Sequence, residues 1–361
     1  MEKENTEENK TESKEQPKEQ AQQKTVVMSS AALLKREAST QQEDIPKMVN
    51  DAKFQKLYIT PERACYVKSG ISKLGLKLAK FIDLPEFARK IIEAYNKQDK
   101  SYSLSYKGRN YNVEVTETIT GEQFCVQKIP SAIPELEKLG FTVSVNKILK
   151  SLTNKSGLIL VAGSSSAGKT TTSASLLKKY LQLEGGYAIT IEDPVELPLD
   201  GVYKTIRGDL GVCKQTTPSS GIILDGIKNA FRAKPNYILI DEITTPDVAE
   251  QILKAATSGY LVIASIKANG INDALKILAK YITSSSVGED MGYDLLSNGL
   301  LACIYQELVG TPKHLRTECL FANPDINAGC QVRGMLRSGN INATTQLEQQ
   351  KRRIDQGQPL F

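Results

Sequence analysis

Short apolar runs alternate with amphipathic segments through the second half of this 361-residue chain. The runs are almost continuously hydrophobic, as in strands buried on both faces, and several of the segments between them repeat apolar residues at helical spacing. Strands and helices alternating in this way predict a parallel sheet built of βαβ units. The runs are GLILVA (157–162), YAITIE (187–192), YILID (237–241) and YLVIASI (260–266), and the clearest helical segments are TTSASLLKKYL (171–181) and TPDVAEQILKAATSG (245–259).

The first half has a different pattern, which predicts a small α+β unit. Residues 101–118 alternate strictly around Lys107–Gly108, so a β-hairpin with one buried face is expected there. Residues 84–98 repeat apolar positions at helical spacing, with Pro85 in the expected first turn. Two strands are predicted at 54–60 and 64–70, and a proline-interrupted connector at 126–141.

These changes of pattern divide the chain into three parts. Residues 1–44 are mostly Glu, Lys, Gln, Asn, Ser and Thr, so they cannot bury enough apolar surface to form a core, and a disordered tail is expected. Residues 45–145 are expected to form the small N-terminal domain with its linker. Residues 146–361 are expected to form the larger α/β core with C-terminal helices.

Overall charge and composition narrow the possible partners and compartments. The formal net charge of +5 comes without an Arg- or Lys-rich block, so direct nucleic-acid binding is not indicated. The six cysteines form no C-x-x-C pair, which disfavours a zinc site. Without an apolar run of about 18 residues, or the apolar core of a signal peptide, we expect a cytoplasmic protein.

The strongest chemical signal is a phosphate-binding loop. The strand GLILVA leads into a G-x-x-x-x-G-K-[ST] motif, and a helix is predicted directly after it. Backbone N–H groups of such a loop and the positive end of the helix bind polyphosphate, Lys169 adds a point charge, and the Thr170 hydroxyl is a ligand for Mg²⁺. The predicted nucleotide-binding residues are Gly163, Ser164, Ser165, Ser166, Ala167, Gly168, Lys169, Thr170 and Thr171.

Two acidic segments follow other predicted strands. Thr190–Glu196 (TIEDPVE) comes after YAITI, and Asp241 and Glu242 end the strand YILI. In a parallel sheet the ligand lies outside the carboxyl ends of the strands, so both segments should lie near the phosphate loop. Carboxylates placed there bind the metal or orient an attacking water. ATP and Mg²⁺ are therefore the expected ligands.

Taken together, these motifs resemble the secretion and pilus ATPases of type II and type IV systems, particularly the pilus-retraction and type IV secretion/conjugation branch. The resemblance covers roughly residues 47–345. Its most discriminating part is TIEDPVE, which is similar to the family's acidic "Asp box". The other matching segments are GSSSAGKTTT (163–172), RAKPNYILIDEI (232–243, Walker B), TSGYLVIASIKANG (257–270, the "His box"), IYQELV (304–309, a Gln-containing helix) and QVRGMLRSG (331–339, a C-terminal helical element).

The resemblance implies a RecA-like P-loop NTPase core, with a parallel sheet, preceded by a small PAS-like α+β domain. It also implies a hexameric ring that works by nucleotide-driven domain rotation and associates peripherally with inner-membrane components of a secretion, conjugation or pilus machine. Nucleotide would lie between neighbouring subunits. The residues that would carry catalysis are Glu192, Glu196, Glu242, Arg207, Arg232 and Lys267, and those that would hold the metal are Thr170, Asp241 and Glu242.

The chain departs from the family pattern in three places. Tyr260 and Lys267 replace the two histidines of the His box, and the chain's single histidine, His314, is expected at the surface. Asp241 stands where the family commonly has Gly. The N-terminal arginines that reach across to nucleotide appear as Asn112 and Gln127, and the substitutes considered for them are Arg109 and Lys128.

Three functions remain open on the sequence. A motor ATPase, slow or stimulated by a partner, agrees with the ordered set of motifs. A nucleotide-binding assembly or regulatory subunit with little hydrolysis agrees with the missing histidines and arginines. A P-loop small-molecule kinase would need an Arg-rich lid, for which the sequence has no candidate segment.

Overall fold

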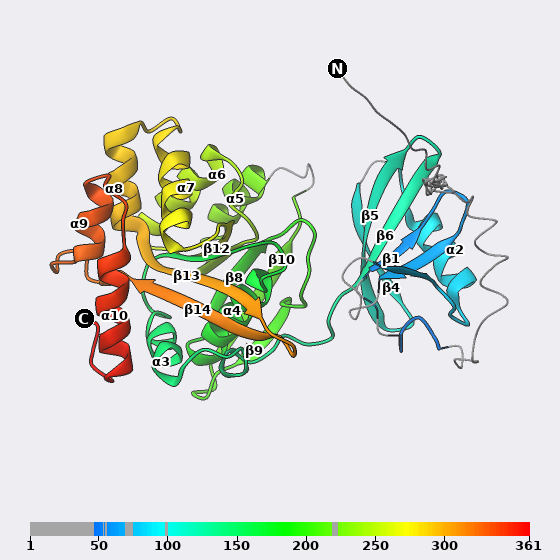
Figure 1. Cartoon of the computed structure of the whole chain (residues 1–361), viewed down its shortest axis with the longest axis horizontal. Helices are drawn as coiled ribbons and strands as arrows, with labels where there is room; N and C mark the ends of the chain where they lie inside the picture. The colour runs from blue at the N-terminus through cyan, green and yellow to red at the C-terminus, as the bar shows by residue number, and fades with distance from the viewer. Residues whose placement is uncertain (1–46, 53, 55, 69–74, 98–99, 219–222) are drawn as a thin grey trace, which may run out of the picture. The chain divides into compact units, whose positions relative to one another are not determined.

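We describe a computed structural model of the chain for residues 47–52, 54, 56–68, 75–97, 100–218 and 223–361. The predicted tail at 1–44 lies outside the described residues. The strands form two separate sheets, one of six strands and one of eight (Figure 1). The larger sheet positions the phosphate loop.

The eight-stranded sheet has the order β14-β13-β7-β12-β11-β8-β10-β9. Its six central strands pair in parallel, and an antiparallel strand lies at each edge. This confirms the predicted parallel sheet. The central strands are β13 (Leu300–Val309), β7 (Gly157–Gly163), β12 (Leu261–Lys267), β11 (Tyr237–Ile240), β8 (Gly186–Ile191) and β10 (Leu210–Thr216), and the edges are β14 (His314–Phe321) and β9 (Gly201–Lys204).

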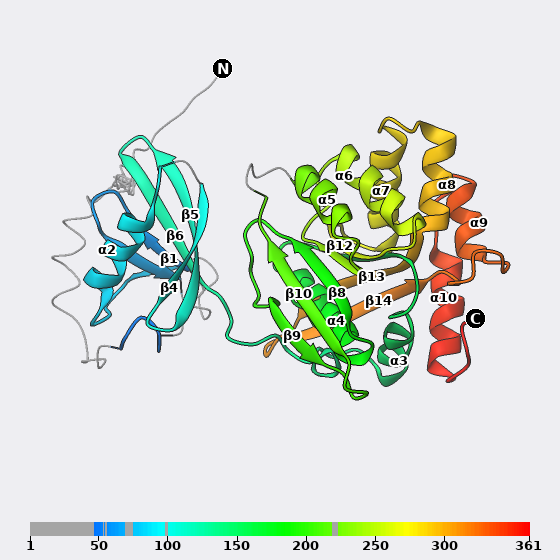
Figure 2. The same ribbon diagram turned by 180° about the vertical axis from the view of Figure 1, so that it is seen from behind.

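Helices cover both faces of this sheet, as the two opposite views show (Figures 1 and 2). Side chains of β7 alternate between two apolar clusters: Leu158 and Leu160 belong to one, and Ile159 and Val161 to the other. The first cluster joins α5 (Ile223–Arg232), α6 (Pro246–Thr257), α7 (Ile271–Thr283), α8 (Glu289–Gly299) and α9 (Gln331–Arg337) to the sheet. The second joins the short 3-10 helix η1 (Leu136–Lys138), α3 (Val143–Ser151) and α4 (Lys169–Leu183), and α10 (Thr344–Asp355) contacts β14.

The ends of α6 show how closely local sequence signals set the helix limits. The Thr245 side chain accepts a hydrogen bond from the Val248 N–H, Pro246 takes the first turn, and Gly259 follows the end with a φ of 101°. These residue types account for the limits of the helix, because Ser or Thr caps an N-terminus, proline tolerates the first turn, and glycine accepts the left-handed conformation. α6 thus begins and ends where the sequence places it.

The six-stranded sheet has the order β3-β2-β1-β6-β5-β4, and all its pairs are antiparallel. Lys107 and Gly108 both have positive φ, 48° and 78°, which is the geometry of a two-residue type I′ hairpin turn. The predicted hairpin and α+β unit are therefore confirmed. The elements are β1 (Lys56–Ile59), β2 (Cys65–Lys68), β3 (Leu76–Leu78), α2 (Leu84–Ala94), β4 (Ser101–Tyr106), β5 (Arg109–Thr118) and β6 (Gly121–Lys128).

Aromatic side chains fill the core between α2 and this sheet. The ring of Phe87 lies 4.8 Å from that of Tyr106 and 4.7 Å from that of Tyr111, between centroids, and both tyrosines are fully buried. Rings in this position serve as packing and are inaccessible to a nucleic-acid base.

The domain boundaries at 44/45 and 145/146 stay predictions.

One expected element is wrong. The segment IYQELV (304–309), matched above to a helix, is the second half of strand β13. Its backbone pairs with β7 on one side, through Ile304 and Tyr305, and with β14 on the other. Sheet pairing on both sides requires an extended chain, so the tertiary context decides the conformation here. The other C-terminal match, QVRGMLRSG, does contain a helix, α9.

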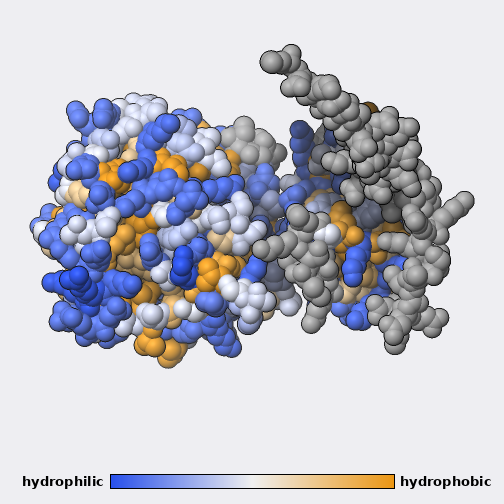
Figure 3. Space-filling model, viewed as in Figure 1, coloured by the Kyte–Doolittle hydropathy of each residue, from blue (hydrophilic) through white to orange (hydrophobic). Residues whose placement is uncertain are grey.

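The surface gives little additional guidance about partners. On the face drawn in Figure 3, hydrophobic residues of the described part appear as scattered patches among hydrophilic ones. Such a distribution is ordinary for a folded protein, because much of any protein surface is apolar. No helix in the described part of the chain combines the length and hydrophobicity needed to cross a bilayer.

Candidate functional site

The loop between β7 and α4 carries the phosphate-binding motif. β7 ends at Gly163, and α4 begins at Lys169 directly after Gly168, which has a φ of 87°. The first N–H groups of a helix have no acceptor within it, and glycine at the cap position supplies no side-chain acceptor for them. The start of α4 therefore presents backbone donors, together with the positive end of the helix dipole, to an anion.

Lys169 is held inside this loop. Its Nζ donates to the backbone oxygens of Gly163, at 3.1 Å, and Ser164, at 3.0 Å. Burial lowers the pKa of Lys169, while the nearby carboxylates of Glu242 and Asp241 act in the opposite direction. Ser164, Ser165 and Ser166 are exposed, and Thr170 and Thr171 are half-buried. The lysine and the hydroxyls thus lie where a bound polyphosphate would need them.

Strand register brings the acidic segments and the phosphate loop together at the carboxyl ends of the parallel strands. Ile240 of β11 lies opposite Ile191 of β8, so Asp241 and Glu192 both follow directly after paired strand ends. Lys267, the last residue of β12, lies opposite Gly163. Since all these strands are parallel, their carboxyl ends lie on the same side of the sheet, as the sequence predicted from the parallel arrangement alone.

Asp241 and Glu242 differ in their surroundings. Burial, with the neighbouring carboxylates of Glu196, Glu192 and Glu242 adding to it, raises the pKa of Asp241 to about 7. Glu242 instead forms an ion pair, with its Oε2 3.0 Å from the Nζ of Lys267. The Ser265 hydroxyl donates to the backbone oxygen of Asp241, which secures the strand end that carries both acids.

The two glutamates of TIEDPVE also separate. Glu192 is 2% exposed, and its Oε1 accepts a hydrogen bond of 2.9 Å from the Gln215 amide. Burial raises the pKa of Glu192. Glu196 is exposed. Gln215 also donates to the Leu197 oxygen at 2.8 Å, so Glu192 helps to hold the segment in place, while Glu196 is open to solvent and ligand.

Neither predicted arginine lies at the phosphate loop of its own chain. Arg207 pairs with Glu184 at 3.1 Å, and Glu184 is at the far end of the 15-residue helix α4, roughly 20 Å from Lys169. Arg232 is the last residue of α5 and precedes the start of β11, whereas Glu242 follows the end of β11. Arg232 therefore lies near the amino end of the strand and Glu242 near its carboxyl end. Their predicted roles would require a neighbouring subunit.

The N-terminal candidates occupy strands of the six-stranded sheet. Asn112 lies opposite Gln127 in the β5–β6 register. The Lys128 ammonium group already forms hydrogen bonds beside its own sheet, because its Nζ donates to the backbone oxygens of Asn50 and Ala52. Burial lowers the pKa of Lys128 to about 8. Of the two substitutes considered for the missing arginines, Arg109 is the less constrained. As predicted, His314 is exposed.

Gln306 belongs to this site, although the sequence matched its segment to a helix and gave the residue no role at the phosphate loop. It lies on β13, is fully buried, and its Nε2 donates to the backbone oxygen of Ala167 in the phosphate loop at 2.8 Å. One signal could have identified it: an amide inside the apolar strand LLACIYQELV must find a hydrogen-bond partner when that strand is buried.

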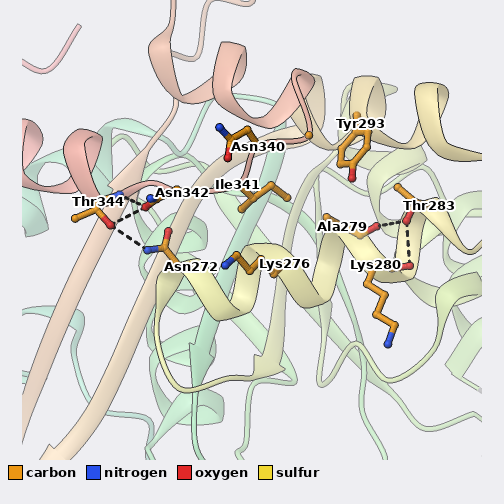
Figure 4. Close-up of a pocket in the computed structure, with 11 residues that line it drawn as sticks. Asn272, Lys276, Ala279, Lys280, Thr283, Tyr293, Asn340, Ile341, Asn342 and Thr344 are labelled. Carbon is orange, nitrogen blue, oxygen red and sulfur yellow. Dashed lines mark hydrogen bonds between the residues drawn. The ribbon is translucent and has the colours of Figure 1, made fainter.

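A separate cavity of about 790 Å³ lies away from the loop (Figure 4). It is bounded by α7, by Tyr293 of α8 and by the segment that leads into α10. Asn272 accepts a 2.7 Å hydrogen bond from the Ala343 N–H and donates to Thr344, which ties α7 to the start of α10. Lys276 also lines the cavity, and none of its lining residues belongs to the acidic segments or the phosphate loop.

Comparison with known proteins identifies the family. The model of the type II/IV secretion system protein family matches residues 82–354. The chain belongs to this family. It is 27% identical over 272 residues to a twitching motility protein of Neisseria gonorrhoeae, a match that spans 72% of this chain and 70% of the relative. It is 28% identical over 245 residues to the type IV pilus ATPase PilU of Pseudomonas aeruginosa, spanning 65% and 58%.

Solved structures show the same fold. The crystal structure of the pilus retraction motor PilT with bound ADP superimposes with a TM-score of 0.62 at 23% identity, covering 82% of this chain and 86% of that one. The Legionella pneumophila ATPase DotB gives a TM-score of 0.62 at 16% identity, covering 88% and 90%. The predicted combination of a P-loop α/β core with a small α+β domain is confirmed by these superpositions.

Proposed function

We propose that this family member binds ATP with Mg²⁺ at the loop Gly163–Thr170 and hydrolyses it to power a type IV pilus or secretion machine. One observation carries the proposal. Lys169, Asp241 and Glu242 gather with Lys267 at the carboxyl ends of the parallel strands, next to the first backbone N–H groups of α4. Positive groups that grip a polyphosphate and carboxylates beside its end are what phosphoryl transfer to water requires.

The residues present are suited to Mg²⁺. Within the described ranges, no group of three or more His, Cys, Asp or Glu side chains is arranged to hold a metal ion by itself. Mg²⁺ usually keeps several waters and binds through one or two protein ligands together with phosphate oxygens, so a complete protein cage is unnecessary. The Thr170 hydroxyl would be one ligand, and Asp241 and Glu242 would hold the ion directly or through water. Bound there, the ion neutralises charge that develops on the phosphates.

The chain's own groups then have separate tasks. Lys169 would leave the Gly163 and Ser164 oxygens for the phosphates, and Lys267 would stabilise negative charge at the terminal phosphoryl group. Glu242 or the exposed Glu196 would accept the proton of the attacking water as its oxygen bonds to phosphorus and the bond to the ADP oxygen breaks. Glu192, which is buried and bound by Gln215, would position the segment that carries Glu196.

The names of relatives support the wider role. PilU is named a type IV pilus ATPase, and the PilT crystal structure is described as a pilus retraction motor with bound ADP. On this basis we propose a cytoplasmic hexameric ring, associated with inner-membrane components of its machine, in which nucleotide drives domain rotation. Arg207 and Arg232, which lie away from their own loop, would act across subunit boundaries in such a ring.

A second candidate function is a nucleotide-binding assembly subunit with little hydrolysis. The pairing of Lys267 with Glu242 favours it, because a carboxylate engaged by a lysine is less available to an attacking water. Phosphate release by the purified full chain, measured with particle mass, separates the two functions. Steady release that Glu242→Gln removes supports the motor. Nucleotide-dependent ring formation without phosphate release supports the assembly subunit, and neither ring nor release would contradict both.

A further inference from the structure

A buried amide lies directly beneath the phosphate loop. Gln306 of β13 is fully buried, its Nε2 donates to the Ala167 oxygen at 2.8 Å, and its Oε1 is buried with no hydrogen-bond partner among the described residues. An apolar side chain at this position would avoid the cost of burying an unpaired oxygen. The amide is therefore expected to serve a purpose that offsets this cost.

The contact sets the orientation of one peptide group. In a planar trans peptide the C=O and the following N–H point in opposite directions. Since Gln306 holds the Ala167 C=O toward β13, the Gly168 N–H must point away from β13. Within the part of the chain that the structure describes, this N–H has no acceptor of its own. Gly168 directly precedes the first turn of α4, whose N–H groups are the other donors of the loop.

Both glycines of the motif pack closely on Gln306. A Cβ on Gly163 would lie 2.5 Å from the Gln306 backbone oxygen, a distance that no real Cβ tolerates. A Cβ on Gly168 would lie 3.3 Å from the Gln306 Nε2. The first and last glycines of the motif thus both pack against Gln306. Strand β13, which carries Gln306, pairs with β7 up to Tyr305 and Ala162.

We propose that Gln306 is a positioning residue for the phosphate loop: its hydrogen bond to Ala167 holds the Ala167–Gly168 peptide in the orientation that presents the Gly168 N–H to a nucleotide phosphate. The inference rests on the proposed nucleotide binding at this loop and assigns the residue that shapes it. Loop N–H groups contact phosphates that ADP and ATP share, so the effect of Gln306 is common to both nucleotides.

The test compares two glutamine amides that each hold a backbone group of another segment. Gln306→Met keeps an unbranched side chain of similar length and removes the hydrogen bond, and Gln306→Asn keeps the amide but is too short to reach Ala167. The matched control is Gln350→Met. Gln350 holds both backbone groups of Phe321, at 2.9 and 2.7 Å, at the other end of β14 and away from the loop. Calorimetry on the full chain measures binding of Mg-ADP and Mg-ATP, with thermal unfolding recorded without nucleotide.

Without the Gln306–Ala167 hydrogen bond, the Gly168 N–H is no longer held toward the phosphates. Either Gln306 variant should therefore bind both nucleotides about tenfold more weakly, with a raised KM for ATP and little change in kcat. Gln350→Met should lower the unfolding midpoint and leave both affinities within about twofold. Wild-type affinity for both nucleotides in both Gln306 variants would overturn the inference while leaving the proposed function intact. Absence of binding in the wild-type chain would overturn the proposed function and this inference with it.

Discussion

Lys267 and Glu242 form an ion pair across the edge of the sheet, with Nζ 3.0 Å from Oε2. The pair joins the last residue of β12 to an acid that follows β11, and both side chains interact electrostatically with Lys169. A terminal phosphate arriving at the loop would compete with Glu242 for Lys267. We therefore expect Lys267 to release the carboxylate only when a triphosphate is bound, which would make the pair sensitive to the nucleotide state.

Replacing Lys267 by Met should affect the triphosphate selectively. The lysine would contact a group that ADP lacks, so ADP affinity should stay within about twofold, and turnover should fall roughly 100-fold because a charge-stabilising donor is lost. Phosphate release and ADP titration measure the two effects. Lys254→Met is the matched control, since Lys254 also pairs with a glutamate, Glu250 at 2.6 Å, on α6. Equal loss of ADP and ATP binding in Lys267→Met would argue against this role.

Replacing Glu242 by Gln should separate binding from chemistry. The amide has the same shape but cannot accept the proton of the attacking water, so turnover should fall roughly 10²- to 10⁴-fold with nucleotide affinity retained. Single-turnover phosphate release is the measurement. Turnover close to that of the wild-type chain would exclude Glu242 as the base and transfer the role to Glu196.

The two glutamates of the TIEDPVE segment should respond differently to the same substitution. Glu196→Gln leaves the buried network intact, so it should alter turnover without changing the unfolding midpoint. Glu192→Gln changes a buried carboxylate that accepts from Gln215, so it should change stability, with turnover following from the disturbed segment. Thermal unfolding and turnover of both variants test this, and a shift in unfolding for Glu196→Gln alone would contradict it.

Asp241 should make stability depend on pH. Its folded-state pKa of about 7 lies above the ordinary 3.8, so the folded chain binds the proton more tightly than the unfolded chain. This favourable contribution is complete below about pH 4, and it is lost as pH rises toward 7. Without nucleotide or Mg²⁺, Asp241→Asn should therefore stabilise the chain above pH 7, by an amount on the order of a few kcal/mol at most.

Denaturant unfolding at pH 5 and pH 8 measures this effect. The difference in stability between Asp241→Asn and the wild-type chain should grow between the two values. Mg-nucleotide should reverse the order at pH 8, because the aspartate then has a positive ion to bind. An equal difference at both pH values would show that the protonation state of Asp241 does not change between them, and it would contradict the raised pKa.

The fold could be predicted in outline because its signals are local. Continuous apolar strands, the Thr245 cap and the Lys107–Gly108 turn each specify their own conformation within a few residues. The phosphate loop was equally clear, since its glycines and Lys169 are contiguous. What the sequence could not supply was strand order, which brings Gln306 beneath a loop about 140 residues earlier in the chain.

The same limit applies to individual side chains. Sequence patterns gave Glu192 and Glu196 as equal candidates, and only the packing of Gln215 separates a buried acid from an exposed one. The arginines at 207 and 232 were matched by motif, yet helix and strand geometry places both far from the loop of their own chain. Roles that depend on a neighbouring subunit cannot be judged from one chain's local pattern.

Calorimetric titration of the full chain with Mg-ATP, alongside Lys169→Ala, tests the central claim most directly. The account predicts one nucleotide site per chain in the wild type and a loss of affinity of roughly 10- to 100-fold in Lys169→Ala, because a charged contact to phosphate is removed. Absence of binding in the wild-type chain, or equal affinity in the two proteins, would contradict it.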